Sequence, residues 1–338
     1  MTSPLLQTDH LTKKFRQKSG FLRQSPPKIA VNSISLRLSP CERLGIVGES
    51  GSGKSTLGRL LLGLTPPSEG MVCFEGQDHK TRSAQDWKRF RRQTALVQQN
   101  PLSALNPQMT IGEQISEALL VHKLADRAGA YAASAEMLER VGLSGAMMSR
   151  YPHQMSGGQR QRVVIARALI LNPKLVVFDE AVSALDVSVQ AQVVALLRSL
   201  WQELDLAYVF ITHDLRIVRY LVDRIAVMYL GRIVETGEIN AIYKNPLHPY
   251  TRALLASVPT MDPSIRNIAP PVKGEAGSEQ SGQGCAFRSR CPLAEGACAG
   301  SEPVLRDFHG RQVACHRAEE LAGAVPHMKS ALIHTGVA

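Results

Sequence analysis

The chain has 338 residues, of which 44% are hydrophobic and 20% are charged, a composition typical of a globular protein with one large domain and a smaller one. It contains no run of roughly 18 apolar residues that could span a membrane, and its N-terminus lacks the apolar stretch of a signal peptide, so we expect a cytosolic chain. The formal charge of +10 suits nucleic acid, anionic lipid or a phosphate ligand, but aromatic residues, at 5%, offer few platforms on which single-stranded nucleic acid could stack.

The apolar pattern near the N-terminus predicts a strand, a glycine loop and a helix. Ile34, Leu36 and Leu38 alternate with polar residues, which is typical of a half-buried strand. A second apolar run, 43–47, is followed by glycine, and a leucine-rich helix is expected over 54–64. This order of elements is typical of an α/β domain.

Helical patterns dominate over about 106–168, and we interpret this segment as a helical subdomain inserted into the α/β domain. After it, the apolar segment 175–178 predicts a buried strand, 187–204 a helix and 208–212 another strand. Strands that alternate with helices predict a parallel sheet.

The glycine loop matches the phosphate-binding loop pattern, which is a glycine, any four residues and then Gly-Lys-Ser. Its glycines let backbone N–H groups turn inward around phosphate oxygens, and the helix that follows points its positive end at them. In this pattern the Lys54 ammonium reaches the β- and γ-phosphates, and the Ser55 hydroxyl binds Mg²⁺. A chance match is expected in on the order of 1% of chains of this length. We therefore predict that a nucleoside triphosphate is bound by Gly48, Glu49, Ser50, Gly51, Ser52, Gly53, Lys54, Ser55 and Thr56.

Two adjacent carboxylates, Asp179 and Glu180, end the apolar strand predicted at 175–178. A strand that ends in acidic residues would be uninformative alone, but it is the expected companion of a phosphate loop. Asp179 is expected to hold Mg²⁺ directly or through water, and Glu180 to polarise the water that attacks the γ-phosphate.

A second glycine-rich segment, Met-Ser-Gly-Gly-Gln-Arg-Gln-Arg, begins at Met155. It resembles the signature Leu-Ser-Gly-Gly-Gln of the ATP-binding-cassette (ABC) family, with methionine in place of leucine. A serine hydroxyl and glycine amides at a helix N-terminus form an anion site. In the family, the signature of one subunit closes over the ATP held by the phosphate loop of another. The resemblance therefore implies a dimer in which the partner's ATP is contacted by Ser156, Gly157, Gly158 and Gln159.

Further segments resemble family motifs and occur in the family's order. Val-Gln-Gln-Asn-Pro resembles the Q-loop, whose glutamine touches Mg²⁺ and the attacking water; we assign it to Gln99, and Gln98 leaves a second register open. Ser-Ala-Leu-Asp, which ends at Asp186, resembles the D-loop. His213 resembles the switch histidine that contacts the γ-phosphate, although a lone histidine is more often structural.

Phe15 agrees with the family pattern, and Ala181 departs from it. Phe15 lies where the family has an aromatic residue that stacks on adenine, but an isolated phenylalanine is equally suited to a core. Ala181 follows Glu180 where the family usually has proline, and because both carboxylates are present we expect catalysis to persist.

The resemblance covers roughly residues 5–260 and implies a P-loop NTPase fold of the ABC cassette type. Such a cassette has a parallel-sheet core, an antiparallel β subdomain and the inserted helical subdomain, and here a small C-terminal extension with cysteines follows. We place the ABC ATPase domain at 1–245, the extension at 246–320 and a tail at 321–338.

The segment Asn-Pro-Leu-His-Pro-Tyr-Thr-Arg-Ala-Leu-Leu, at 245–255, resembles the extension of the dipeptide, oligopeptide and nickel importer ATPases. Within that group the chain most resembles the second ATPase subunit of dipeptide or oligopeptide importers. Asp-Glu-Ala-Val-Ser, at 179–183, is similar to the nickel branch, which leaves nickel or a metal chelate as an alternative cargo.

The resemblance also implies partners and a location. These are a second ATPase subunit, two transmembrane permease subunits and an extracytoplasmic substrate-binding protein, with this chain at the cytoplasmic face of the inner membrane. A soluble ABC ATPase that acts on DNA or ribosomes is a remote alternative, because such proteins usually carry paired cassettes or a long coiled-coil insertion. We therefore expect no nucleic-acid partner.

Six cysteines are unevenly distributed along the chain. Cys41 and Cys73 are expected to be small buried hydrophobic residues. The other four follow a loop or linker predicted at 270–284, and a reducing cytosol favours metal binding over disulfides for such a group. Their gaps of five, six and 16 residues exceed the two to four residues common in structural zinc sites. Four thiolates at wider spacing suit an iron–sulfur cluster, and the family extension implies a [4Fe–4S] cluster held by Cys285, Cys291, Cys298 and Cys315. Zinc and unligated thiols remain open.

Overall fold

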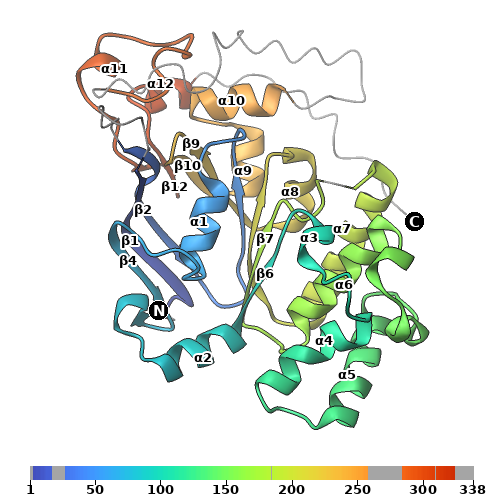
Figure 1. The fold of residues 1–338 in the computed structure, drawn as a ribbon. Helices are drawn as coiled ribbons and strands as arrows, with labels where there is room; N and C mark the ends of the chain where they lie inside the picture. The colour runs from blue at the N-terminus through green and yellow to red at the C-terminus, as the bar shows by residue number, and fades with distance from the viewer. Residues whose placement is uncertain (1–2, 17–26, 184, 258–283, 309, 324–338) are drawn as a thin grey trace, which may run out of the picture.

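A computed structural model describes residues 3–16, 27–183, 185–257, 284–308 and 310–323 (Figure 1). Its strands are β1 Leu6–Phe15, β2 Lys28–Leu38, β3 Arg43–Val47, β4 Glu69–Phe74, β5 Gln77–Asp78, β6 Thr94–Val97, β7 Leu175–Asp179, β8 Ala207–Thr212, β9 Arg224–Tyr229, β10 Arg232–Glu238, β11 Arg306–Phe308 and β12 Arg311–Val313. Its α-helices are α1 Lys54–Leu61, α2 Ala84–Gln93, α3 Pro101–Ala104, α4 Ile111–Val121, α5 Arg127–Arg140, α6 Gly157–Leu169, α7 Val187–Glu203, α8 Leu215–Leu221, α9 Ile239–Lys244, α10 Pro249–Ala256, α11 Ala297–Gly300 and α12 Ala318–Gly323. Short 3₁₀ turns are η1 His79–Thr81, η2 Gly145–Ser149 and η3 Pro152–Gln154.

The strands form two sheets. The larger sheet has the order β11-β12-β10-β9-β3-β8-β7-β6, and its neighbours from β9 to β6 run parallel. The smaller sheet has the order β2-β1-β4-β5 and is antiparallel. The predicted α/β fold, with a parallel core and an antiparallel subdomain, is confirmed.

The central strands are buried on both faces, as expected for a parallel sheet covered on both sides. In β7, Leu175 and Val177 pack with α1 and the antiparallel sheet, whereas Val176 and Phe178 pack with the helices on the opposite face. Strands β3 and β7 both run parallel to β8, which lies between them. The carboxyl ends of β3 and β7 therefore lie at the same edge of the sheet.

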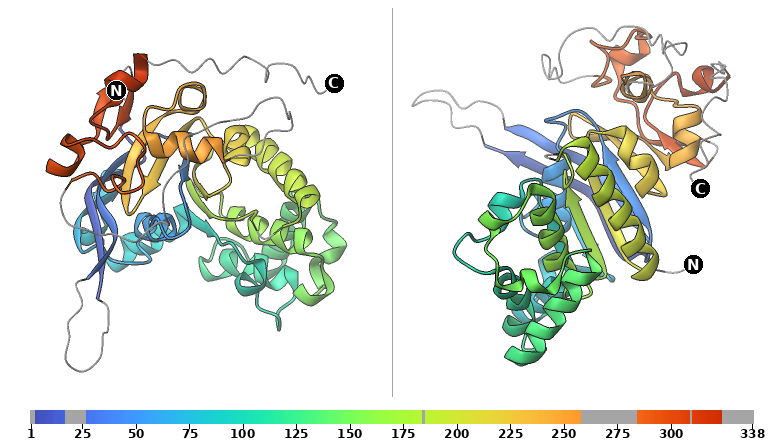
Figure 2. Two further views of the ribbon diagram at one scale, coloured as in Figure 1. Left: turned by 90° about the horizontal axis from the view of Figure 1, so that it is seen from above. Right: turned by 90° about the vertical axis from the view of Figure 1, so that its right-hand side faces the viewer.

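The predicted helical subdomain consists mainly of α4, α5 and α6, which lie at the opposite end of the molecule from the cysteine-bearing extension (Figures 1 and 2). The hydroxyl of Thr110 and the carboxylate of Glu113 form a capping box at the start of α4. Asp126 caps α5 by accepting a hydrogen bond from the Gly129 N–H.

Helix α1 ends at Leu61, three residues before the predicted end. Gly63 takes a φ of 62°, and its N–H donates to the Leu60 carbonyl while the Leu64 N–H donates to the Arg59 carbonyl. This pair of bonds is a Schellman motif, which ends a helix at a residue in the left-handed conformation.

The prediction that Cys41 is a buried core residue is wrong. Cys41 is exposed in the turn between β2 and β3, with a φ of 59°, and its thiol donates to the Asp205 carbonyl. Cys73 is only partly buried, because it lies in β4 of the small antiparallel sheet.

The extension shares the main sheet with the cassette. Strand β12 pairs with β10, so the predicted division at residue 245 separates two strands of one sheet. Glu235, in β10, is buried at this junction, where it accepts hydrogen bonds from the N–H groups of Leu247 and His248, both at 2.9 Å. Burial raises the pKa of Glu235, while these bonds and the nearby Arg311 oppose that rise.

Candidate functional site

A pocket of about 880 Å³ opens around the predicted phosphate loop between β3 and α1. Its lining combines the whole of the loop from Glu49 to Thr56 with the ends of β1 and β2, with Gln99 and Glu180, and with the turn at Tyr229–Gly231. Polar loop groups thus face side chains at the ends of β1, β2 and β9 and residues that follow β6 and β7, which is the composition expected of a nucleotide pocket.

The loop conformation requires glycine where the chain approaches β2. Gly53 has a φ of 101°, and a Cβ at this position would lie 2.0 Å from the carbonyl oxygen of Ala30. The N-cap of α1 therefore lies against β2, and the first residues of the helix line the pocket, which is the position of an anion site at a helix N-terminus.

Lys54 is buried at the base of the loop. Its ammonium donates hydrogen bonds to the carbonyl oxygens of Gly48 and Glu49, both at 2.8 Å. Burial lowers the pKa of Lys54, and the nearby carboxylates of Glu180, Asp179 and Glu49 oppose that change. Backbone carbonyls and neighbouring carboxylates thus stabilise the charge of Lys54.

Two of the three residues predicted to contact Mg²⁺, Ser55 and Asp179, are in contact with each other. The Ser55 hydroxyl donates to the Asp179 carboxylate at 2.8 Å. Burial raises the pKa of Asp179, the Ser55 hydrogen bond lowers it, and the neighbouring charge of Glu180 raises it. A hydroxyl and a carboxylate at hydrogen-bond distance are the oxygen ligands that Mg²⁺ prefers, so this pair fits the ion.

Glu180 brings three predicted catalytic residues together. Its carboxylate accepts a hydrogen bond from the Gln99 amide at 2.9 Å, and its other oxygen lies 3.2 Å from His213 Nδ1. Glu180 has a φ of 50°, an unfavourable backbone conformation of the kind that clusters at functional sites. The Gln99 side chain thus faces Glu180, and none of its hydrogen bonds within the described residues reaches Asp179 or Ser55.

The signature segment lies on the surface, away from this pocket. Ser156 caps α6 through a capping box with Gln159, and both Ser156 and Gly157 are exposed. Gly158 is buried where α6 meets α7, because a Cβ there would lie 2.4 Å from Val189. No signature residue is among the described residues that line the phosphate-loop pocket.

Asp186, predicted to belong to the D-loop, and Phe15, predicted to stack on adenine, both have exposed side chains. Asp186 is exposed and caps α7 by accepting the Val189 N–H at 2.9 Å. Phe15 ends β1 with 42% of its surface exposed, and its ring lines the pocket. The alternative that Phe15 is a core residue is therefore wrong.

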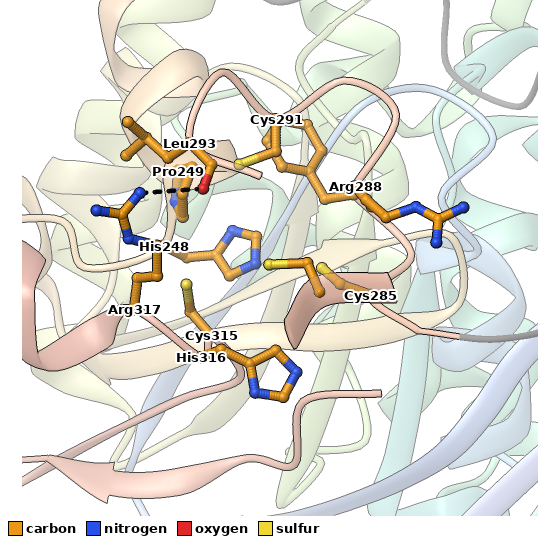
Figure 3. Close-up of a pocket in the computed structure, with 11 residues that line it drawn as sticks. His248, Pro249, Cys285, Arg288, Cys291, Leu293, Cys315, His316 and Arg317 are labelled. Carbon is orange, nitrogen blue, oxygen red and sulfur yellow. Dashed lines mark hydrogen bonds between the residues drawn. The ribbon is translucent and has the colours of Figure 1, made fainter. Parts of the chain in front are cut away.

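The four C-terminal cysteines all line one small cavity (Figure 3). The sulfur atoms of Cys285, Cys291 and Cys315 lie around the ring of His248, and all four residues are free thiols. Burial raises the pKa of Cys285 and Cys291, and it raises that of Cys315 to about 11.

The cysteine cavity measures about 10 Å³, close to the volume that holds one water. Thiolates are ligands of both iron–sulfur clusters and zinc, so the chemistry of the donor set fits either. Among the described residues, no group of three or more His, Cys, Asp or Glu side chains has the arrangement of a metal site. Among the described residues, the four cysteines therefore share one cavity without forming a defined metal site.

Sequence motifs alone did not single out His248, Tyr250 or Arg290. His248 is fully buried beside the cysteines, and burial lowers its pKa to about 3, so its ring is neutral. Its Nδ1 accepts the Tyr250 N–H at 3.0 Å. Tyr250 and Arg290 contact the phosphate loop. The resemblance of the His-Pro-Tyr segment to the importer extension was the sequence signal that could have identified His248 and Tyr250.

Comparison with known proteins agrees with this geometry. Residues 31–183 match the model of the ABC transporter family, and residues 234–298 match that of the oligopeptide/dipeptide transporter C-terminal region. The chain is 46% identical to the oligopeptide transport ATP-binding protein OppF of Salmonella typhimurium, over 88% of this chain and 90% of that protein. It is 42% identical to the di/tripeptide transport ATP-binding protein DppF of Pseudomonas aeruginosa, over 94% and 99%.

Two solved structures share the cassette fold. CbiO1 of Clostridium perfringens, part of the ABC transporter complex cbiONQ, has a TM-score of 0.62 and 25% identity, over 72% of this chain and 91% of that chain. The ATP-binding cassette MJ0796, as a dimer in a post-hydrolysis state bound to ADP and Pi, has a TM-score of 0.61 and 27% identity, over 69% of this chain and 98% of that chain.

Within the described residues no helix is long and apolar enough to cross a bilayer.

Proposed function

The chain belongs to the ATP-binding proteins of ABC transporters, and we propose that its ATPase activity drives the import of dipeptides or oligopeptides. The observation that carries the peptide assignment is the extension, which resembles the peptide-transporter C-terminal region and packs against the phosphate loop. The relatives named above transport peptides, and this favours peptide over the nickel or metal-chelate cargo considered from residues 179–183.

The site suggests how the residues of this chain divide the work of hydrolysis. Backbone N–H groups of the loop and the Lys54 ammonium bind the β- and γ-phosphates. The water oxygen bonds to the γ-phosphorus while the bond from that phosphorus to the bridging oxygen of ADP breaks, and a Glu180 oxygen takes up the proton. Gln99 and His213 orient the Glu180 carboxylate. Mg²⁺, held at Ser55 and Asp179, would neutralise phosphate charge.

We further propose that the working unit pairs this chain with a second ATPase subunit. Exposure of Ser156 and Asp186, and their separation from the pocket, support a site completed by a partner. Two transmembrane permeases and an extracytoplasmic binding protein would complete the importer, with this chain on the cytoplasmic face of the membrane. A soluble cassette that acts without a membrane partner is disfavoured by the peptide-type extension.

Reconstitution tests the cargo. The purified importer in lipid vesicles is expected to hydrolyse ATP faster when its binding protein is loaded with short peptides, and the ligand that copurifies with that protein, identified by mass spectrometry, is expected to be a peptide. A matched importer with Glu180→Gln controls for contaminating ATPases. Stimulation by Ni²⁺ or a nickel chelate, with no response to peptides, would overturn the peptide assignment.

We also propose that the four thiols hold a [4Fe–4S] cluster that fixes the extension, with zinc as the alternative. Convergence of all four cysteines on one cavity supports ligation, and a small extension gains order from a bound metal. Anaerobically purified protein is expected to be brown, to absorb near about 400 nm and to contain about four irons per chain.

A matched pair of variants separates a specific site from adventitious iron. Cys298→Ser is expected to lose the colour and the iron, whereas Cys41→Ser, which removes an exposed thiol outside the cavity, is expected to keep both. Colourless protein with one zinc per chain would replace the cluster with the zinc alternative, and metal-free protein would remove both.

A further inference from the structure

Two residues of the described part of the C-terminal extension, Tyr250 and Arg290, form hydrogen bonds with the phosphate loop at Glu49. The Glu49 N–H donates to the hydroxyl oxygen of Tyr250 at 2.8 Å. The Glu49 carboxylate accepts from both terminal nitrogens of Arg290, at 2.9 and 3.1 Å. Two parallel bonds from a guanidinium to one carboxylate form a bidentate pair, which specifies geometry as well as charge.

The surroundings hold Arg290 in position. Its side chain is 11% exposed and that of Glu49 is 31% exposed. The guanidinium lies 5.8 Å from the ring centroids of both Tyr229 and Phe287, and Tyr250 packs against Tyr229. A pair that is mostly enclosed is screened by salt less than a surface ion pair.

Glu49 places a negative charge in the loop that must bind a polyanion. Its backbone carbonyl already accepts a hydrogen bond from the Lys54 ammonium, so its charge lies close to the cation that binds phosphate. Without a counter-charge, the carboxylate would offset part of the attraction between Lys54 and the triphosphate. Arg290 supplies that counter-charge from 241 residues away in the sequence.

We propose that Arg290 is a positioning residue for ATP binding, which neutralises Glu49 and, with the Tyr250 hydroxyl, holds the phosphate loop in the conformation that accepts ATP. It acts through Glu49, since Glu49 lines the nucleotide pocket and Arg290 does not. Arg290 directly precedes Cys291, which lines the cysteine cavity. A change in the structure of that cavity would therefore also move Arg290 and alter the affinity for ATP. This inference concerns nucleotide binding and does not depend on the transported cargo.

The test compares Arg290→Ala with the Arg290→Ala/Glu49→Gln double variant of the full-length chain, read as the Kd of a fluorescent ATP analogue with Mg²⁺. Arg290→Ala is expected to raise the Kd about tenfold, because it leaves a partly buried carboxylate without its charged partner beside the phosphates. Glu49→Gln in the Arg290→Ala background removes the unpaired charge and is expected to return the Kd to within about threefold of the parent. The increase in Kd caused by Arg290→Ala is expected to be smaller at high salt, because salt screens the repulsion between the unpaired Glu49 carboxylate and the phosphates.

Two further variants make the result decisive. Arg140→Ala breaks another Arg–Glu pair, with Glu203 at 2.9 Å in the helical region, and is expected to leave the Kd unchanged. Arg290→Lys keeps the charge but loses the bidentate fork, so an intermediate Kd is expected even if Arg290→Ala fails to fold. An unchanged Kd in folded Arg290→Ala or Arg290→Lys would overturn the proposal. A double mutant that binds ATP no better than Arg290→Ala would do the same.

Discussion

Glu180→Gln is expected to bind ATP with the parent affinity and to lose about 10²-fold or more of its turnover, the range for loss of a general base. The amide is nearly isosteric with the carboxylate, so the hydrogen bond from Gln99 can persist at the remaining oxygen. The amide, however, cannot take up the proton of the attacking water. The affinity for ATP should therefore be unchanged while the turnover falls.

The measurement is single-turnover ATP hydrolysis by the assembled ATPase pair, together with the nucleotide Kd. Glu136→Gln, which makes the same chemical change at an exposed position on α5, is the matched control and is expected to retain full turnover. The partner's own site must be inactivated in both preparations. Near-normal turnover of Glu180→Gln under that condition would remove Glu180 from the role of base.

The phosphate loop and the strand at β7 could be predicted because their chemistry is contiguous in sequence. A loop of glycines that ends in Lys54 makes its contacts within a few residues, and an apolar strand carries Asp179 to the same edge of a parallel sheet. The meeting of Glu180 with His213 follows from the same topology, since both residues follow neighbouring strands.

Contacts between distant segments could not be predicted in this way. Nothing in the local pattern around Arg290 identifies Glu49 as its partner, because the two residues are 241 positions apart and the extension that carries Arg290 joins the main sheet through β12. Cys41 shows the converse error: its apolar neighbours suggested burial, but the turn at this position directs it to solvent. Side-chain exposure at a turn depends on the path of the whole chain.

Ser156→Arg is expected to slow hydrolysis strongly at a site whose phosphate loop belongs to the partner subunit, while leaving this chain's own loop able to bind ATP. Ser156 is exposed at the start of α6, where its hydroxyl and the N–H groups that follow can face an anion from outside. An arginine there adds bulk and removes the hydroxyl. We expect about a 10²-fold loss at the affected site, the range for removing a donor that stabilises developing charge.

Combining this variant with Lys54→Ala distinguishes a site shared between subunits from one formed within a single chain. If sites are shared, Lys54→Ala and Ser156→Arg disable different sites of the pair, and the double variant loses the activity that each single variant retains. If one chain forms its own site, the double variant is no worse than Lys54→Ala alone. Ser199→Arg, on α7, makes the same substitution away from the signature and is expected to keep full activity. The shared-site model also predicts weak hydrolysis by the isolated chain, so a strictly monomeric preparation that hydrolyses ATP at the full rate of the pair would exclude it.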